Sequence, residues 1–217
     1  MKQLPLNNIH KLLGANLADI SGWAVPADYG DKLSEYQAVR KNVGIIDLSS
    51  RGKLKLSGKD HLKFLQGMLS NDVIKLEEGK GIYATILTVK GRMVSDMKVY
   101  KDKDSVLLDL EPGLNQVVLE LLTKFRLSYK ASIDDISETT GLISIQGPKA
   151  RKLLEILFEE DIAPMEELNF IQKKFMDSEL MIVSVNRSGE EGFDLYIENK
   201  ALADLWEQLL KKGQDLN

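Results

Sequence analysis

The stretch from Gly81 to Tyr100, GIYATILTVKGRMVSDMKVY, is the clearest structural signal in the chain. Its first run is rich in β-branched and apolar residues, Lys90-Gly91-Arg92 forms a short break, and a second strand-like run follows. Two such runs, joined by so few residues that include a glycine, predict an antiparallel hairpin. Because alternate residues of a strand point to opposite faces, Asp96 and Lys98 are expected to share the face opposite Met97.

Outward from this hairpin, apolar periodicity and turn residues predict helices and strands that alternate along the sequence. Asp31 is a suitable cap for the first expected helix, and proline suits the first turn of the helix that follows Gly147. We expect helices over Asp31–Gly44, Lys59–Leu69, Leu114–Phe125, from Pro148 onward and over Leu202–Leu210. We expect strands over Ile45–Leu48, Lys53–Leu56, Ser105–Leu110, Tyr129–Ile133, Gly141–Ile145, Phe170–Phe175, Leu180–Val185 and Phe193–Ile197.

Two of these helices carry an apolar stripe that indicates which side faces a core. In the helix over 59–69 the stripe is Leu62, Leu65, Met68 and Leu69, with Phe64 flanking it. In the helix over 114–125 the expected apolar positions are Val117, Val118, Leu121 and Leu122. Strand hairpins interspersed with such helices predict an α+β fold with mainly antiparallel sheets. The segment between Gly58 and Thr140 could form a lobe inserted into the rest.

Composition places the chain among ordinary folded proteins and excludes several kinds of chemistry. The chain has 217 residues, of which 43% are hydrophobic and 29% charged, and its net charge is −4. It has no cysteine, which excludes disulfides, thiolate metal sites and cysteine nucleophiles. The only histidines, His10 and His61, are far apart without ligand spacing, so no metal site is predicted.

The sequence favours a cytoplasmic protein that binds neither membranes nor nucleic acid. The first residues, MKQLPLNNIHKLLG, contain no continuous apolar segment of the kind that a secretory signal requires. No apolar run approaches the length needed to span a membrane. A net charge of −4 and the lack of a dense basic run interleaved with aromatic residues argue against a nucleic-acid partner.

Several short motifs, taken in order, resemble the family of the glycine-cleavage T-protein (aminomethyltransferase) and its folate-binding relatives. They include Gly22-Trp23-Ala24-Val25-Pro26, Gly44-Ile45-Ile46-Asp47-Leu48-Ser49, Ser70-Asn71-Asp72-Val73, Gly81-Ile82-Tyr83, Asp96 after the hairpin turn, Gln146-Gly147-Pro148-Lys149-Ala150 and Ser188-Gly189-Glu190-Glu191-Gly192-Phe193. The resemblance implies a T-protein-like folate-binding fold. It would have a discontinuous first domain at 1–54 and 141–217 and an inserted ferredoxin-like lobe at 55–140. The family's C-terminal β-domain would be absent.

The resemblance also implies which residues hold tetrahydrofolate. Asp96 matches the family's catalytic aspartate near the folate N10, where a carboxylate can accept a hydrogen bond and stabilise developing positive charge. Glu179 matches a carboxylate that grips the pterin, whose edge offers two parallel N–H donors. Tyr83 matches a tyrosine that lines the folate cleft. Read without the family, the same residues would be a solvated strand acid, a loop acid and a cross-strand aromatic.

Two further cofactor-binding candidates depart from the family pattern. Asp194 stands where the family has a glutamate near the folate tail, and an exposed strand acid is the alternative interpretation. Arg187 replaces a motif tyrosine; its guanidinium plane can stack, but it cannot reproduce the hydroxyl. Ser95 replaces the first of two paired aspartates, and Ser50-Arg51 replaces a His-Met pair, so the resemblance implies a partly retained site.

The expected function is therefore a tetrahydrofolate-dependent aminomethyl (one-carbon) transferase of the glycine-cleavage type. Its donor would be the lipoyl arm of the carrier called H-protein. One alternative is a non-catalytic module that binds folate or a protein. Another is one half of a split or oligomeric transferase, completed by a separate C-terminal domain chain or by a second copy. The family's iron–sulfur-assembly branch uses a cysteine-containing motif. Because this chain has no cysteine, a role in that branch is disfavoured.

Overall fold

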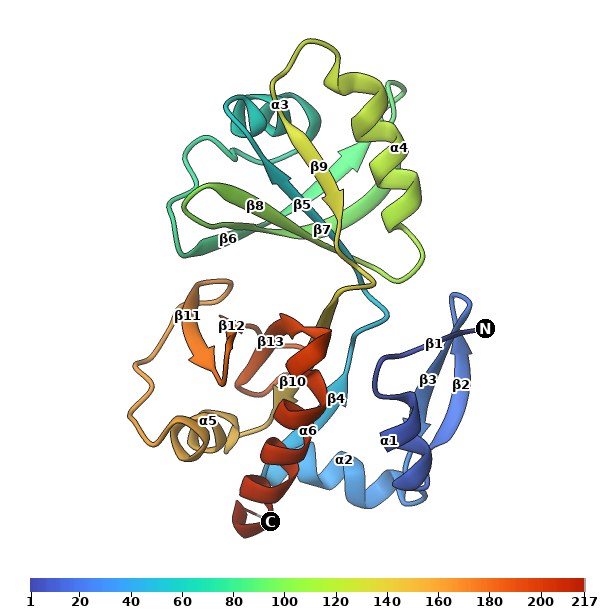
Figure 1. Cartoon of the computed structure of the whole chain (residues 1–217), viewed down its shortest axis with the longest axis vertical. Helices are drawn as coiled ribbons and strands as arrows, with labels where there is room; N and C mark the ends of the chain where they lie inside the picture. Colours follow the sequence, from blue (N-terminus) through green and yellow to red (C-terminus); the bar gives the residue numbers. More distant parts are fainter. Residues whose placement is uncertain (217) are drawn as a thin grey trace. The chain divides into compact units, whose positions relative to one another are not determined.

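The computed structural model describes residues 1–216 and divides the chain into two compact units (Figure 1). Unit 1 combines Met1–Ser50 with Thr139–Asn217, and unit 2 is Arg51–Glu138. Each unit has a five-stranded sheet in which all neighbouring strands are antiparallel. The prediction of an α+β fold with mainly antiparallel sheets is thus confirmed.

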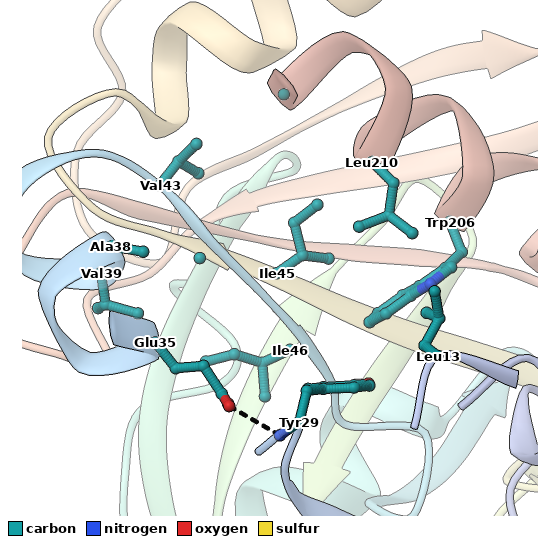
Figure 2. Close-up of a pocket in the computed structure, with 12 residues that line it drawn as sticks. Leu13, Tyr29, Glu35, Ala38, Val39, Val43, Ile45, Ile46, Trp206 and Leu210 are labelled. Atoms are coloured by element: carbon teal, nitrogen blue, oxygen red, sulfur yellow. Dashed lines mark hydrogen bonds between the residues drawn. The ribbon is translucent and has the colours of Figure 1, made fainter. Parts of the chain in front are cut away.

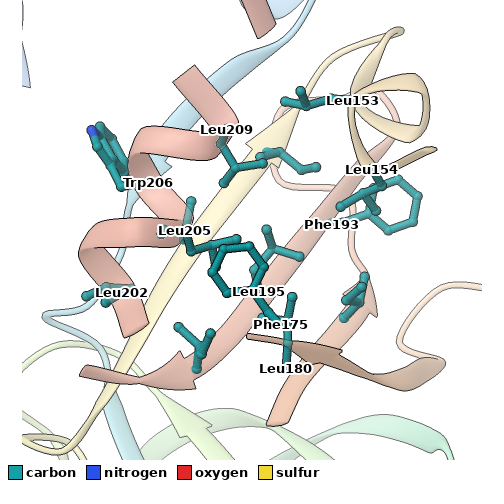
Figure 3. Close-up of a cluster of buried hydrophobic side chains, with 14 of the residues drawn as sticks. Leu153, Leu154, Phe175, Leu180, Phe193, Leu195, Leu202, Leu205, Trp206 and Leu209 are labelled. Carbon is teal, nitrogen blue, oxygen red and sulfur yellow. The ribbon is translucent and has the colours of Figure 1, made fainter. Parts of the chain in front are cut away.

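The main sheet of unit 1 packs one face against two helices. Its strand order is β11-β12-β13-β10-β4. Figure 3 shows Leu205 and Leu209 of one helix meeting Leu195 on the middle strand. The strands are β4 (Gly44–Asp47), β10 (Thr140–Gln146), β11 (Phe170–Phe175), β12 (Ser178–Ser184) and β13 (Gly192–Glu198), and the helices are α5 (Ala150–Phe158) and α6 (Asn199–Gly213), with a short 3-10 turn, η1 (Gln214–Leu216), after α6.

The first part of unit 1 forms a small sheet of order β1-β3-β2 and two helices. The Asp31 carboxylate accepts a hydrogen bond from Ser34 N (3.0 Å), which confirms the expected helix start. The sequence pattern predicts no element before Asp31, because these elements are short and their strands lack a clean alternation of apolar and polar residues. They are β1 (Lys2–Gln3), α1 (Asn7–Leu12), β2 (Asn16–Ile20), β3 (Trp23–Asp28) and α2 (Lys32–Lys41).

Unit 2 is built around the predicted hairpin, which forms as β6 and β7. Its strand order is β6-β7-β8-β5-β9. Without β6, this is the order of a ferredoxin-like split βαβ unit in which α3 and α4 are the crossovers. The elements are β5 (Gly52–Ser57), α3 (His61–Met68), β6 (Lys80–Leu87), β7 (Met93–Lys101), β8 (Ser105–Leu110), α4 (Asn115–Arg126) and β9 (Ser132–Asp135).

Three details of the predicted core of unit 2 are wrong. Phe64 is only 2% exposed and lies in the core rather than beside it, and Val117 is 49% exposed rather than buried. The expected strand from Tyr129 begins instead at Ser132, because the backbone before it turns: Tyr129 N donates to the Arg126 carbonyl and Ala131 N to the Tyr129 carbonyl. For Phe64 and Val117 the way the helix meets the sheet, which the local pattern does not encode, decides the outcome.

Candidate functional site

One face of the unit 2 sheet packs the core, and the other carries ionisable side chains. On β5, β7 and β8, the core takes Leu54, Met97 and Leu108, while their neighbours point the other way. Strand register places Lys98 opposite Asp109, and Asp109 opposite Lys53. We call the outer side the charged sheet face; it consists of Tyr83, Asp96, Lys98, Asp109 and Lys53, together with Arg51 and Glu111 at the strand ends.

Tyr83 and Asp96, two predicted site residues, meet on this face. The Tyr83 hydroxyl donates to Asp96 Oδ2 at 2.8 Å, diagonally across the β6–β7 ladder. The Tyr83 side chain is 55% exposed, so the pair is accessible. The hydrogen bond to Asp96, then partial burial and the charges of Asp96 and Glu111, raise the pKa of Tyr83. Tyr83 therefore remains a donor at neutral pH, and the Asp96 carboxylate keeps capacity for a further donor.

Arg51, at the end of β5, is committed to two carboxylates. Its Nε donates to Asp109 Oδ1 at 2.8 Å and its Nη1 to Glu111 Oε1 at 2.5 Å. The side chain of Arg51 is 8% exposed and that of Asp109 is fully buried. A buried charge is tolerated when it is paired in this way. Leu110 is the register partner of Met97, so Glu111, the next residue, lies opposite Asp96. The hydrogen bond from Arg51 holds the Glu111 side chain at this position.

The sequence pattern does not single out Asp109, Glu111 or Lys53 as site residues. Lys53 is buried, and its Nζ donates to the Arg51 carbonyl oxygen at 2.8 Å. A signal was available, because the period-two alternation of the two strands already places Lys53 and Asp109 away from the leucine side. The alternation does not show that β5 pairs with β8, and this pairing is what brings Lys53 and Asp109 together.

In unit 1, Arg187 and Asp194 form a bidentate ion pair. Arg187 Nε lies 3.0 Å from both Asp194 oxygens, and Nη2 lies 2.6 Å from Oδ2. The Asp194 side chain is fully buried and that of Arg187 is 18% exposed. The interpretation of Asp194 as an exposed strand acid is therefore wrong. Both of its oxygens accept from Arg187, the residue that departs from the family motif.

Gln146 holds the loop that carries Arg187. Its Nε2 donates to Ser144 Oγ at 3.0 Å and to the Val185 carbonyl at 3.1 Å, and its Oε1 accepts from Arg187 N at 3.0 Å. Packing here is tight, because a Cβ on Gly192 would lie 2.2 Å from Gln146 Nε2. The Gln146 motif contributed to the family resemblance, but this positioning contact was not predicted.

Glu179 lies on β12, not in a loop, and is exposed. It is paired across the hairpin with Lys174. Asp194 pairs with Val183, four residues further along β12, so Glu179 shares its sheet face but lies roughly 13 Å away along the strand. The structure thus pairs Tyr83 with Asp96 in unit 2 and Arg187 with Asp194 in unit 1. Glu179 lies on the same five-stranded sheet of unit 1 as Asp194.

Two observations on the described part of the chain bear on the kind of site. Among residues 1–216, no cluster of three or more histidine, aspartate or glutamate side chains is arranged to hold a metal ion. Over the same residues, no helix combines the length and apolar character needed to cross a membrane.

Comparison with known proteins identifies the family to which these features belong. The model described as the GCVT N-terminal domain matches residues 6–217, so the chain is a member of that family. Among curated relatives, the aminomethyltransferase of Bdellovibrio bacteriovorus is 34% identical over 219 residues, covering 100% of this chain and 60% of its own. That of Caldanaerobacter subterraneus subsp. tengcongensis is 32% identical over 220 residues, covering 99% and 58%. The chain therefore spans a little over half the length of these relatives.

Solved structures show the same fold. The glycine cleavage system aminomethyltransferase T from Bartonella henselae superposes with a TM-score of 0.88 at 23% identity, over 96% of this chain and 57% of that chain. A chain of the heterotetrameric sarcosine oxidase from a Corynebacterium species superposes with a TM-score of 0.60 at 14% identity. In that case 98% of this chain and 94% of the other are covered. At these identities the likeness concerns the fold alone.

Proposed function

We propose that this chain provides the tetrahydrofolate-binding part of an aminomethyl transferase of the glycine-cleavage type. The observation that carries the proposal is the accessible Tyr83–Asp96 pair, at the positions where the family motifs predict folate contacts. Relatives called aminomethyltransferase, aligned over the whole chain, support it. We also propose that the two units correspond to the discontinuous first domain and the inserted lobe of the family.

Two predicted folate-binding residues, each considered within its own unit, are chemically suited to a reduced folate. Asp96 has acceptor capacity beyond its bond to Tyr83, so it can accept a hydrogen bond from the folate N10 and stabilise positive charge there. Glu179 is an exposed carboxylate, as bidentate binding of a pterin edge requires. Tetrahydrofolate, when bound, would supply the nitrogens that accept the one-carbon unit.

Arg187 and Asp194 fit the folate less directly. The Asp194 oxygens already accept from Arg187, so a second set of donors from a folate tail would have to compete with a bidentate ion pair. We propose that the two residues act together: Asp194 orients the guanidinium, and the partly exposed Arg187 plane offers a stacking surface in place of a tyrosine ring.

The donor and further partners follow from the family. We propose a lipoyl-bearing carrier such as H-protein as the aminomethyl donor, with ammonia released as the one-carbon unit passes to folate, and we place the reaction in the cytoplasm. We also propose a separate polypeptide, or a second copy of this chain, as a further partner.

A second candidate function is a non-catalytic folate-binding or protein-interaction module. The Arg187–Asp194 ion pair favours it, because a carboxylate that the family resemblance predicts to lie near the ligand is paired here within the protein. Folate binding without transfer would then be the expected behaviour.

Calorimetric titration with tetrahydrofolate and a one-carbon transfer assay separate these candidates. Asp96→Asn should abolish transfer and leave folate affinity largely intact, because the charge acts on the reacting nitrogen. Asp104→Asn, the same change at an exposed turn, is the matched control and should alter neither quantity. No heat at millimolar folate would overturn the proposal and favour an interaction module, and binding without transfer would favour the non-catalytic module.

A further inference from the structure

The end of the β6–β7 hairpin in unit 2 gathers apolar side chains and positive charge on the surface. Every residue of the segment 87–93, which we call the hairpin tip, is exposed. Val89 is 90% exposed and Met93 64%, and Leu87 beside them is exposed as well. Apolar side chains that gather on a surface with charged residues beside them mark sites of contact with proteins or membranes.

The two cations of the hairpin tip, Lys90 and Arg92, are not balanced by the protein itself. From residue 86 to residue 94 the sequence contains no acidic residue. Within the described residues 1–216, no ion pair includes either of the two side chains. The whole chain has a net charge of −4, so the hairpin tip reverses the sign locally. Such a surface attracts an acidic partner.

Hydrogen bonds hold the hairpin tip in one conformation. Thr88 N donates to the Arg92 carbonyl at 2.8 Å, and Gly91 N donates to the Thr88 carbonyl at 2.9 Å. Arg92 N donates in turn to Thr88 Oγ1 at 3.1 Å. Gly91 has a φ of 74°, a conformation that glycine adopts without steric cost. The hairpin tip therefore presents its side chains without the ordering cost that a flexible loop incurs on binding.

The apolar side chains of the hairpin tip continue the charged sheet face that carries Tyr83 and Asp96. Leu87 follows Tyr83 on β6 at an even spacing, so strand alternation places both on one face, about 13 Å apart along the strand. Met93 is the register partner of Leu87 and shares this face. A protein docked at the hairpin tip could therefore extend a long flexible arm along the sheet and hold its end near the Tyr83–Asp96 pair.

The free edge of β6 is closed, which limits how a partner can bind. Ser70 N donates to the Thr85 carbonyl at 3.0 Å, and Asn71 Nδ2 donates to the Tyr83 carbonyl at 2.9 Å. An added strand would have to displace these donors. A partner is therefore expected to bind through the side chains of the hairpin tip.

The number of cations favours a protein over a lipid surface. Segments that bind anionic membranes carry about four to eight lysine and arginine residues, and the hairpin tip has only Lys90 and Arg92. One side chain as exposed as Val89 suits instead an apolar recess in a protein, with the two cations meeting acidic residues around it.

We propose that the hairpin tip docks an acidic protein surface that has an apolar recess for Val89, and that this protein is the carrier of the aminomethyl group. A carrier bound there would direct its arm along the sheet face of Tyr83 and Asp96. The identity of the partner as the carrier rests on the proposed function. The charge and the apolar character of its surface follow from the hairpin tip alone.

Lipoylated H-protein is the probe, titrated into the chain labelled with ¹³C at its methionine methyl groups. The chain has seven methionines, and Met93→Leu identifies the signal from the hairpin tip. The Met93 signal should shift saturably, whereas the signal of Met97, which lies in the core, should stay in place. No binding of H-protein by calorimetry, or binding that leaves the Met93 signal unchanged, would overturn the proposal.

Charge reversal tests the electrostatic part of the interface. Lys90→Glu should weaken H-protein about tenfold, and this loss should shrink as salt is added. Lys103→Glu, the same reversal at the exposed turn at the other end of β7, is the matched control and should weaken H-protein less than about twofold. Equal losses in the two variants would mean that the chain attracts H-protein only through its overall charge, which would overturn docking at the hairpin tip.

A second pair of variants tests the apolar part. Val89→Ser should weaken H-protein about fivefold, as expected for an anchoring side chain, whereas Val117→Ser, on the exposed side of α4, should have no effect. Unchanged affinity in Val89→Ser would contradict the apolar recess. Self-association of the chain that Val89→Ser abolishes, without H-protein binding, would overturn the carrier in favour of a second copy. Binding to vesicles of phosphatidylserine and phosphatidylcholine that Lys90→Glu abolishes, again without H-protein binding, would do so in favour of a membrane.

Folate titration separates this inference from the proposed function. Lys90→Glu and Val89→Ser should keep the tetrahydrofolate affinity of the unaltered chain, because the hairpin tip lies beyond the Tyr83–Asp96 pair. Folate binding together with H-protein binding that ignores both variants would overturn the docking site alone. H-protein binding that depends on the hairpin tip, in a chain that gives no heat with folate, would support the docking site and overturn the proposed folate binding.

Discussion

The two five-stranded sheets each present a carboxylate that the family motifs select, but they use it in opposite ways. On β7, Asp96 is shared with a half-exposed tyrosine, and on β13 the fully buried Asp194 is shared with an arginine in a bidentate ion pair. We call the first the open pair and the second the closed pair. A motif position therefore identifies the residue, whereas the residue's hydrogen-bond partner decides whether it is available to a ligand.

Breaking the closed pair should have the largest effect on stability. Asp194→Asn removes the charge that balances Arg187, and we expect the free energy of unfolding to fall by about 3 kcal/mol, because an uncompensated charge remains in a mostly buried position. Urea unfolding followed by tryptophan fluorescence measures this, since both tryptophans lie in unit 1. Glu179→Gln, an exposed acid on the same sheet, is the control and should change stability by less than about 0.5 kcal/mol. Equal effects would mean that Asp194 is not in a closed pair in solution.

The packing around the closed pair gives the next largest effect. A Cβ on Gly192 would collide with the Gln146 side chain that holds the Arg187 loop, so Gly192→Ala should destabilise unit 1 by about 1–3 kcal/mol. Gly67, in α3, has open space around it, and Gly67→Ala should stabilise its helix by about 0.5–1 kcal/mol. Chemical unfolding of the two variants tests the contrast, which fails if both change stability in the same direction.

Changing the open pair should barely alter stability. Tyr83→Phe removes one hydroxyl from a half-exposed side chain, and we expect a change of less than about 0.5 kcal/mol in the free energy of unfolding. Differential scanning calorimetry of the variant provides the measurement. A loss comparable with that of Asp194→Asn would show that the Tyr83–Asp96 pair is structural and would weaken its assignment to a ligand.

The smallest effect is a shift in titration. The hydrogen bond to Asp96 is the main cause of the raised pKa of Tyr83, so Asp96→Asn should lower that pKa toward its ordinary value of 10.0. A raised pKa means that the folded state keeps the phenol proton longer than the unfolded chain. Its contribution to stability is therefore present below pH 10.0 and declines as pH rises above it. Alkaline NMR titration of the Tyr83 ring measures the shift, and an unchanged pKa in Asp96→Asn would contradict the hydrogen bond.

The sequence by itself determined the hairpin, most of the later strands and the α+β class. These depend on apolar periodicity and on turn residues such as Gly91, which act between neighbours in the chain. The ordered motifs also determined family membership, which the match over residues 6–217 confirms. The positions of Tyr83 and Asp96 on adjacent strands of one hairpin followed from the same local reasoning, although their roles toward a ligand remain a prediction.

Only the tertiary structure decided which charges pair and which stay open. Arg51 reaches Asp109 and Glu111, which are 58 and 60 residues away along the chain, because β5 pairs with β8 in one register. Asp194 is buried on the face of β13 opposite the hydrophobic core, where Arg187 lies against it. An apolar hollow in unit 1 likewise forms only because α2, β4 and α6 meet (Figure 2). Such contacts depend on strand order and register, which arise from the packing of the whole unit and leave no trace in the local pattern.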